Sequence, residues 1–287
     1  MDTKKPTKKR KPFYPLKYDI VFRMFFSDER NEEELIGFLK SILWLPENEY
    51  ESIEISDPHL LPDYIMEKYA IVDVKLHTKT KKIIHIEIQL NVSEHMRKRV
   101  VFYDAKLITE QIDHKEQYDT IQRVISIIIT EENLIPGSSN YHHRFTLYDP
   151  NAGVEFSDIL EIHTLELKKL PADTDGENLY DWGKLIAAET EEELDMITQR
   201  NPEMKKAIVK LRELSADEKA RDMIERRQKG ILDFNMFMND AKMEGLVEGR
   251  TEERNEIALR LLKLNLPLEQ IAMITGLNRE EVDELRG

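Results

Sequence analysis

Apolar residues recur at helical spacing in two stretches near the start of the chain. The first stripe is Ile20, Val21, Met24 and Phe25, and the second is Leu35, Ile36, Leu39 and Ile42. Residues three and four positions apart share one face of a helix, so each stretch predicts an amphipathic helix. Ser27 and Asp28 separate the two helices, and Pro46 marks the end of the second. Residues 50–62 then predict a strand that leads into a loop.

The pattern changes to a period of two across residues 70–90, which is typical of strands. The polar run at 78–82 divides this stretch and predicts a hairpin turn centred near Thr80. In that register Asp73 lies opposite Glu87, and Lys75 lies opposite His85. One face then carries Ile71, Asp73, Lys75, His77, Ile83, His85, Glu87 and Gln89, and the other carries only apolar side chains. Two carboxylates therefore project from the same face of the hairpin.

The remainder of the chain divides into a strand-rich part and a helical part. An amphipathic helix is expected over residues 93–112, with Val100, Tyr103, Leu107 and Ile108 facing inward. Residues 119–132 predict a central strand, because the run from Val124 to Ile129 is apolar on both faces. Further strands are expected at 143–150 and 161–171. Helices are expected afterwards at 176–190, 191–200, 202–215 and 216–264, with two short ones between 267 and 286.

Composition narrows the class of protein. The 287 residues are 40% hydrophobic and 34% charged, which suits a globular protein with one sizeable core and a smaller unit. The chain has no cysteine, so disulfides, thiolate nucleophiles and thiolate metal sites are excluded. We find no apolar run long enough to span a bilayer and no signal-peptide core behind the basic N-terminus. These features predict a cytoplasmic protein without membrane partners.

Charge is distributed unevenly along the chain. The formal net charge of −14 argues against a general polyanion binder. Basic residues nevertheless concentrate at 4–17 and in the helix predicted after the hairpin, whereas the C-terminal half is acidic. The first 12 residues are expected to form a solvated, disordered tail. A glycine-rich phosphate loop, a nucleophile elbow and paired zinc-binding histidines are all missing from the sequence.

The two hairpin carboxylates need a chemical explanation, because like charges facing each other across strands are destabilising. A proton, a basic partner or a divalent cation relieves that repulsion. Carboxylate oxygens suit Mg²⁺ or Mn²⁺, which can acidify an attacking water and neutralise charge on a phosphodiester. Gln89 shares the face and can orient such a water. The alternative is an ordinary polar sheet face in which Lys75 pairs with Asp73 or Glu87.

These motifs together resemble a known family. The segments YDIVFRMFF, VDVKL, IHIEIQL and RKRVVFYDAKLI occur in the order found in the recombination-promoting nuclease and transposase family, a branch of the PD-(D/E)XK nuclease superfamily. The resemblance covers residues 15–170. It implies an α/β fold, a mixed sheet flanked by helices, and divalent-metal-dependent DNA endonuclease activity linked to bacterial recombination or mobile elements. An all-helical C-terminal extension is expected after it.

The resemblance also implies roles for individual residues. Asp73 matches the first acid of the superfamily and Glu87 the second, and these two would bind Mg²⁺ or Mn²⁺. Gln89 occupies the position of the superfamily's lysine, as is usual in the family resembled here. Because an amide cannot change charge, either the metal alone activates the water or Lys75 supplies the positive charge. Asp19 matches an acid on the family's first helix, where it either supports the site or caps the helix.

The basic helix after the hairpin offers a DNA-binding surface. Its candidate phosphate ligands are Arg97, Lys98, Arg99 and Lys106, and the alternative is a solvated helix face. The two last helices resemble a helix-turn-helix, with Gly276 suited to the turn and Asn278 to an N-cap. The second of them is acidic, which favours packing or homo-oligomerisation over DNA binding.

The predicted organisation has four parts. They are a tail at 1–12, a nuclease core at 13–170, a helical extension at 171–250 and a small helical module at 251–287. The rival to a nuclease is a catalytically inactive DNA-binding or protein-interaction module that keeps the same fold.

Overall fold

The computed structural model describes residues 13–56, 74–112 and 117–286. The chain forms two compact units, Met1–Ile224 and Glu225–Gly287, and each is described by itself. The first unit contains the sheet and the helices packed on it. The second contains the distal part of a long helix and two short helices.

A mixed six-stranded sheet forms the centre of the first unit in the described residues. Its spatial order is β1-β2-β3-β4-β6-β5, with β3, β4 and β6 parallel and the other neighbours antiparallel. The strands are β1 (Glu54–Ser56), β2 (Val74–His77), β3 (Ile83–Gln89), β4 (Val124–Thr130), β5 (His142–Asp149) and β6 (Val154–Glu166). Lys75 pairs with His85, which confirms the predicted hairpin register. Asp73, the expected partner of Glu87, lies outside the described residues.

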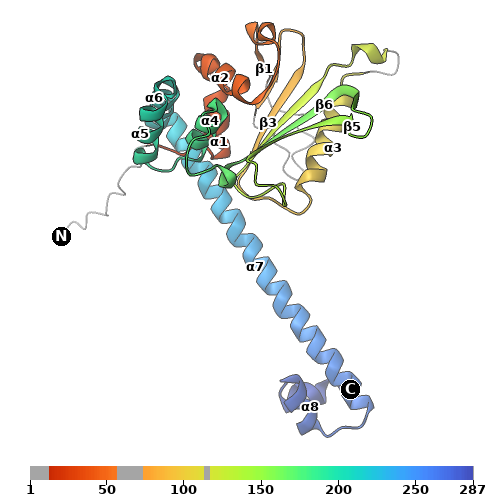
Figure 1. The fold of residues 1–287 in the computed structure, drawn as a ribbon. Coiled ribbons are helices and arrows are strands. Elements are labelled where there is room, and N and C mark those ends of the chain that lie inside the picture. The colour runs from red at the N-terminus through yellow and green to blue at the C-terminus, as the bar shows by residue number, and fades with distance from the viewer. Residues whose placement is uncertain (1–12, 57–73, 113–116, 287) are drawn as a thin grey trace, which may run out of the picture. The chain divides into compact units, whose positions relative to one another are not determined.

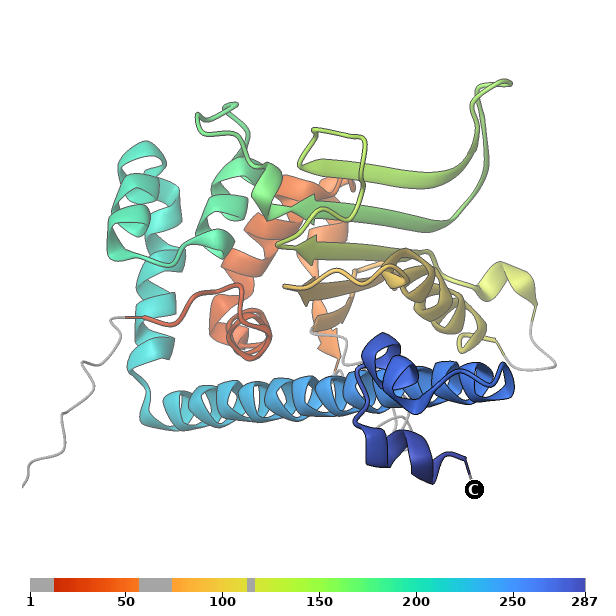
Figure 2. The same ribbon diagram turned by 90° about the horizontal axis from the view of Figure 1, so that it is seen from below.

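Helices cover both faces of this sheet, with α1, α2 and α4 on one side and α3 on the other (Figures 1 and 2). The helices are α1 (Asp19–Phe26), α2 (Glu32–Ile42), α3 (Met96–Thr109), α4 (Asn178–Ala187), α5 (Glu191–Arg200), α6 (Lys205–Ala216), α7 (Glu218–Lys263), α8 (Leu268–Thr275) and α9 (Arg279–Glu284). Short 3₁₀ turns occur at Glu29–Asn31, Glu47–Glu51, Tyr118–Thr120, Leu167–Lys169 and Pro202–Met204. The change from strands to helices after β6 agrees with the sequence.

The larger hydrophobic core lies between the sheet and α1, α2 and α4 to α6. Ile84, Ile86 and Ile88 enter it from β3, and their alternation leaves the odd-numbered residues of β3 on the opposite face. The helices of residues 178–216 contribute to this same core through side chains such as Trp182 and Leu211. The structure therefore groups these helices with the sheet, and its two compact units divide at residue 224.

Two small apolar clusters hold α3 against the other face of the sheet. Met96 and Val100 pack with Ile128 and Leu134 near the start of the helix. Leu107 packs with Ile83 and Val124 nearer its end. Val100 and Leu107 are buried as the sequence predicted, whereas Tyr103 and Ile108 are only half-buried. The part of the sheet between the two clusters is where the polar side chains of β3 lie.

The second unit is stabilised by three buried side chains and by two residues that cap the helices at its turn. Ala258 of α7, Ile271 of α8 and Val282 of α9 form its small core. Gly276 ends α8 with a φ of 70°, a left-handed conformation that glycine adopts without strain. Asn278 then accepts a hydrogen bond from the Glu281 amide as the N-cap of α9. The turn chemistry expected for Gly276 and Asn278 is confirmed.

A buried ionic network crosses the sheet at β5 and β6, on the α1 side. The Glu161 carboxylate accepts hydrogen bonds from Arg123 and from Arg144 Nη2, the latter at 2.8 Å. Its other oxygen lies 2.6 Å from Nε2 of His163. Burial raises the pKa of Glu161, but the hydrogen bonds from His163 and Arg144 outweigh it and lower the pKa to about 2. The network therefore requires an ionised Glu161.

Glu161→Gln is expected to flatten the loss of stability in acid. A carboxyl whose pKa falls on folding stabilises the folded protein above its unfolded pKa of 4.5, and this contribution disappears as the pH drops towards 2. The wild type should therefore lose stability more steeply than the variant over that window in urea unfolding at several pH values. Exposed Glu155 provides the control, since Glu155→Gln should follow the wild type. Parallel curves for all three proteins would contradict the assignment.

Candidate active site

Glu87 lies on β3, on the face of the sheet that α3 covers. Its residue exposure is 5%, so a charged carboxylate there requires a partner. Arg99, on the first half of α3, provides one through an ion pair between its Nη2 atom and Oε1 of Glu87. The Arg99 side chain is 29% exposed. The structure gives no hydrogen bond from a described residue to the second carboxylate oxygen, Oε2.

A second polar cluster lies directly beside Glu87. His85, two residues earlier on the same face, has its Nδ1 atom 3.2 Å from the hydroxyl of Ser126 on β4. That hydroxyl donates a hydrogen bond to Oδ1 of Asp104, which projects inward from α3. All three residues are fully buried. The cluster thus connects the sheet to α3 below the ion pair of Glu87 and Arg99.

Two atoms of this cluster are unsatisfied among the described residues. They are Nε2 of His85 and Oδ2 of Asp104, and both are buried. Oε2 of Glu87 lies 3.9 Å from Nε2 of His85, which is too long for a hydrogen bond. Buried polar atoms normally have hydrogen-bond partners. Two such atoms without a partner, beside a buried carboxylate, therefore indicate a binding site for a ligand or an ion.

The other expected catalytic residues lie along the same two strands. Lys75 of β2 pairs with His85 across the hairpin and is half-buried. Gln89 ends β3 and is also half-buried, and alternation places its side chain on the face of His85 and Glu87. Asp73 belongs to the part of the chain that the structure does not describe. The structure therefore brings Lys75, Glu87 and Gln89 to one face and leaves the role of each as a prediction.

The four basic residues of α3 fall into different environments. Arg97 and Lys98 are exposed, whereas Arg99 turns towards Glu87. Lys106 is half-buried, with its ammonium 5.0 Å from the ring centre of Phe102. The structure thus gives Arg99 a protein partner where the sequence suggested a phosphate.

Asp19 is the first residue of α1, and its Oδ1 atom accepts a hydrogen bond from the amide of Ile20 at 2.7 Å. The N-cap of α1 is Tyr18, and no side-chain cap is formed there, so this contact does not establish the capping alternative. A supporting role of Asp19 at the active site stays a prediction.

Comparison with known protein families decides the class of the protein. The sequence model of the family described as PD-(D/E)XK nuclease family transposase matches residues 16–241. The chain belongs to this family. No curated protein and no solved structure matches the chain. The mixed sheet with flanking helices agrees with the PD-(D/E)XK fold, so the recognition of the family and the fold class predicted from the sequence are both confirmed.

Nucleases of the PD-(D/E)XK superfamily typically use divalent metal ions. Within residues 13–56, 74–112 and 117–286, no three His, Asp or Glu side chains are grouped closely enough to hold an ion. Asp73, the first of the two metal ligands expected from the sequence, lies outside those ranges. No helix in the described ranges is long and apolar enough to cross a bilayer.

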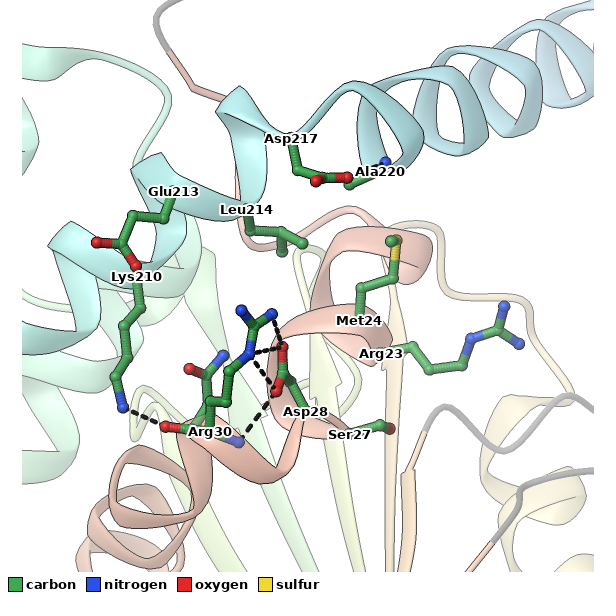
Figure 3. A pocket seen from close by; sticks show the side chains of 11 residues that line it. Arg23, Met24, Ser27, Asp28, Arg30, Lys210, Glu213, Leu214, Asp217 and Ala220 are labelled. Carbon is green, nitrogen blue, oxygen red and sulfur yellow. Dashed lines mark hydrogen bonds and ion pairs between the residues drawn. The ribbon is translucent and has the colours of Figure 1, made fainter.

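A separate cavity of about 630 Å³ lies between α1, α6 and the first turn of α7 (Figure 3). Two of its basic side chains already have partners. Arg30 donates hydrogen bonds to Asp28 from two nitrogens, and Lys210 donates one to the backbone carbonyl of Arg30. Nothing in this cavity matches the chemistry of the family, and we assign it no role.

Sequence reasoning missed Asp104 and Ser126 and gave His85 no role. Two signals were available. Asp104 stands at the inward spacing of Met96, Val100 and Leu107 on α3, where an apolar residue is expected. Ser126 interrupts an otherwise aliphatic central strand. Each breaks a local pattern, and buried polar residues that break such patterns concentrate at functional sites.

Proposed function

We propose that this protein is a divalent-metal-dependent DNA endonuclease whose active site contains Asp73 and Glu87. The proposal rests above all on Glu87, a buried carboxylate at the position of the family's second acid, one of whose oxygens has no hydrogen bond from the described residues. Such an oxygen suits a hard divalent cation, which carboxylates bind together with water and substrate phosphate. The residues present therefore fit Mg²⁺ or Mn²⁺.

The residues of the site have distinct roles in this proposal. When bound, the ion would make the attacking water more acidic and would neutralise charge on the phosphodiester. Asp73 and Glu87 would hold the ion, and the amide of Gln89 would orient the water. Lys75, next to His85 in the hairpin, supplies positive charge near the scissile phosphate. Arg99 neutralises Glu87 when no ion is bound.

The direct test is cleavage of supercoiled plasmid DNA with Mg²⁺, with Mn²⁺ and with EDTA. Nicking by the wild type that requires a metal, and that Asp73→Ala loses while remaining folded, would support the proposal. Failure of a folded wild type to cleave under any metal would instead favour the rival, an inactive DNA-binding or protein-interaction module with a nuclease fold. Linkage to recombination or mobile elements follows the family description and needs a genetic test, such as recombination frequency in cells that lack the gene.

DNA is the proposed partner of the exposed start of α3. Arg97 and Lys98 are both solvent-exposed, whereas Arg99 is occupied by Glu87, so the first two are the better phosphate ligands. The double substitution of Arg97 and Lys98 to alanine is expected to weaken DNA binding uniformly and to reduce the slope of log K against log salt by about 2. Equal affinity of this variant and the wild type at low salt would favour a solvated helix face.

Self-association is the proposed role of the middle of α7. Its exposed apolar residues include Leu232, Met236, Phe237, Met243 and Val247, with Phe237 68% exposed. A helix that is apolar on several sides is normally covered, and a second copy of the chain is a suitable cover. Phe237→Glu is expected to shift the protein to a smaller mass in light scattering. An unchanged monomeric mass in both proteins would contradict this role.

A further inference from the structure

We propose that His85 is a further ligand of the metal ion, held in position by Ser126 and Asp104, and that it makes the site prefer transition-metal ions to Mg²⁺. The inference rests on the proposed function, because it concerns the same site. It adds a nitrogen ligand to the Glu87 carboxylate and thereby identifies the chemical class of the ion.

The first step of the argument is the position of the proton on the imidazole ring. The single hydroxyl proton of Ser126 is donated to Oδ1 of Asp104. The Ser126 oxygen is then free to accept, and Nδ1 of His85 lies 3.2 Å from it. In a neutral ring only one nitrogen carries hydrogen, so a proton on Nδ1 leaves a lone pair on Nε2.

The second step concerns what surrounds Nε2. This atom is buried and has no hydrogen-bond partner among the described residues. It faces Oε2 of Glu87 at 3.9 Å. Two lone-pair donors facing each other repel unless something lies between them. Because metal–nitrogen and metal–oxygen bonds are each roughly 2.1 Å long, one ion can contact both atoms at that separation.

The third step is the support behind the ring. A histidine that binds a metal usually donates its second N–H to a carboxylate, a backbone carbonyl or a water, which fixes the ring and makes the free nitrogen more basic. Here Ser126 and Asp104 form that support, from the neighbouring strand and from the covering helix. A fully buried carboxylate such as Asp104 is otherwise unexpected at an inward position of α3.

The nature of the ligands then decides the kind of ion. Mg²⁺ favours oxygen ligands and water, whereas imidazole favours divalent transition metals. A site in which His85 and Glu87 both contribute ligands should therefore bind Mn²⁺ more tightly than Mg²⁺. Loss of His85 should remove that difference.

The test uses Mn²⁺ as a paramagnetic probe of the full-length protein. Pulsed electron paramagnetic resonance of the bound ion is expected to show coupling to an imidazole ¹⁴N nucleus, which His85→Gln removes. In titration calorimetry the same variant should lose at least about 10-fold in Mn²⁺ affinity, with little change for Mg²⁺, because losing even a residue that only supports a ligand typically costs about 10- to 100-fold. Exposed His95 is the matched control, and His95→Gln should keep both the coupling and the affinity.

The possible failures can be told apart. Mn²⁺ binding that depends on Glu87 but shows no nitrogen coupling in the wild type would overturn the role of His85 and leave the proposed nuclease intact. That wild-type measurement does not depend on whether His85→Gln folds. If Glu87→Gln leaves Mn²⁺ binding unchanged, the metal site itself is wrong, and the proposed function is overturned together with this inference.

Discussion

Replacing Arg99 with methionine is expected to destabilise the metal-free protein by about 3 kcal/mol. Removing one partner of a buried ion pair leaves the other charge uncompensated, which typically destabilises by about 3–5 kcal/mol. The low end applies because the Arg99 side chain is 29% exposed, while that of Glu87 is only 7% exposed. Methionine keeps much of the aliphatic length that lies along α3. The measurement is urea unfolding in EDTA, with Arg97→Met as a control on an exposed position of the same helix.

The same variant should respond strongly to metal. Arg99 and a divalent ion both neutralise Glu87, so losing the first increases the benefit of the second. Mn²⁺ should therefore restore most of the lost stability, and the variant should bind Mn²⁺ more tightly than the wild type. A deficit that is equally large in EDTA and in saturating Mn²⁺ would show that Arg99 acts only through packing.

Glu87→Gln is expected to reduce metal-dependent DNA cleavage by at least about 10²-fold, the size of effect found when one group that stabilises transition-state charge is removed. The amide nearly preserves the shape of the side chain but cannot provide an anionic ligand. Thermal unfolding of the metal-free variant should therefore reveal a folded protein, so that the loss of cleavage reports on chemistry. Glu94→Gln, at an exposed position before α3, should cleave like the wild type. Cleavage by Glu87→Gln at the wild-type rate would exclude Glu87 from the active site.

The sequence allows the hairpin and most helices to be predicted, because local patterns determine them. Alternation around a polar turn is enough to place Lys75 opposite His85. Likewise, Gly276 and Asn278 specify the turn between α8 and α9 without help from distant residues. The family resemblance supplied the position of Glu87, which the pattern alone left open between a metal site and a polar surface.

Contacts between distant segments could not be predicted in the same way. The basic residues of α3 at positions 97–99 are consecutive in the sequence. Arg99 points inward because Met96 and Val100 pack against β4, which fixes the orientation of the helix. The core that the sheet shares with α4 to α6 could not be predicted either. A helical pattern indicates which face of a helix is apolar, but it does not indicate which surface that face packs against. The resulting division near residue 170 followed secondary structure, whereas the compact units follow packing.

The contact between the segment before α1 and helix α6 has a consequence for synthesis of the protein. The amide of Tyr14 donates to the hydroxyl of Ser215, 201 positions later, and α1 and α6 belong to one core. About 130 residues separate Glu87 from Ser215. At 5–20 residues per second, the ribosome therefore needs roughly 6 to 26 s after Glu87 to complete helix α6. The first unit can therefore complete its core only after α6 has been translated, and products truncated before this helix should lack that core.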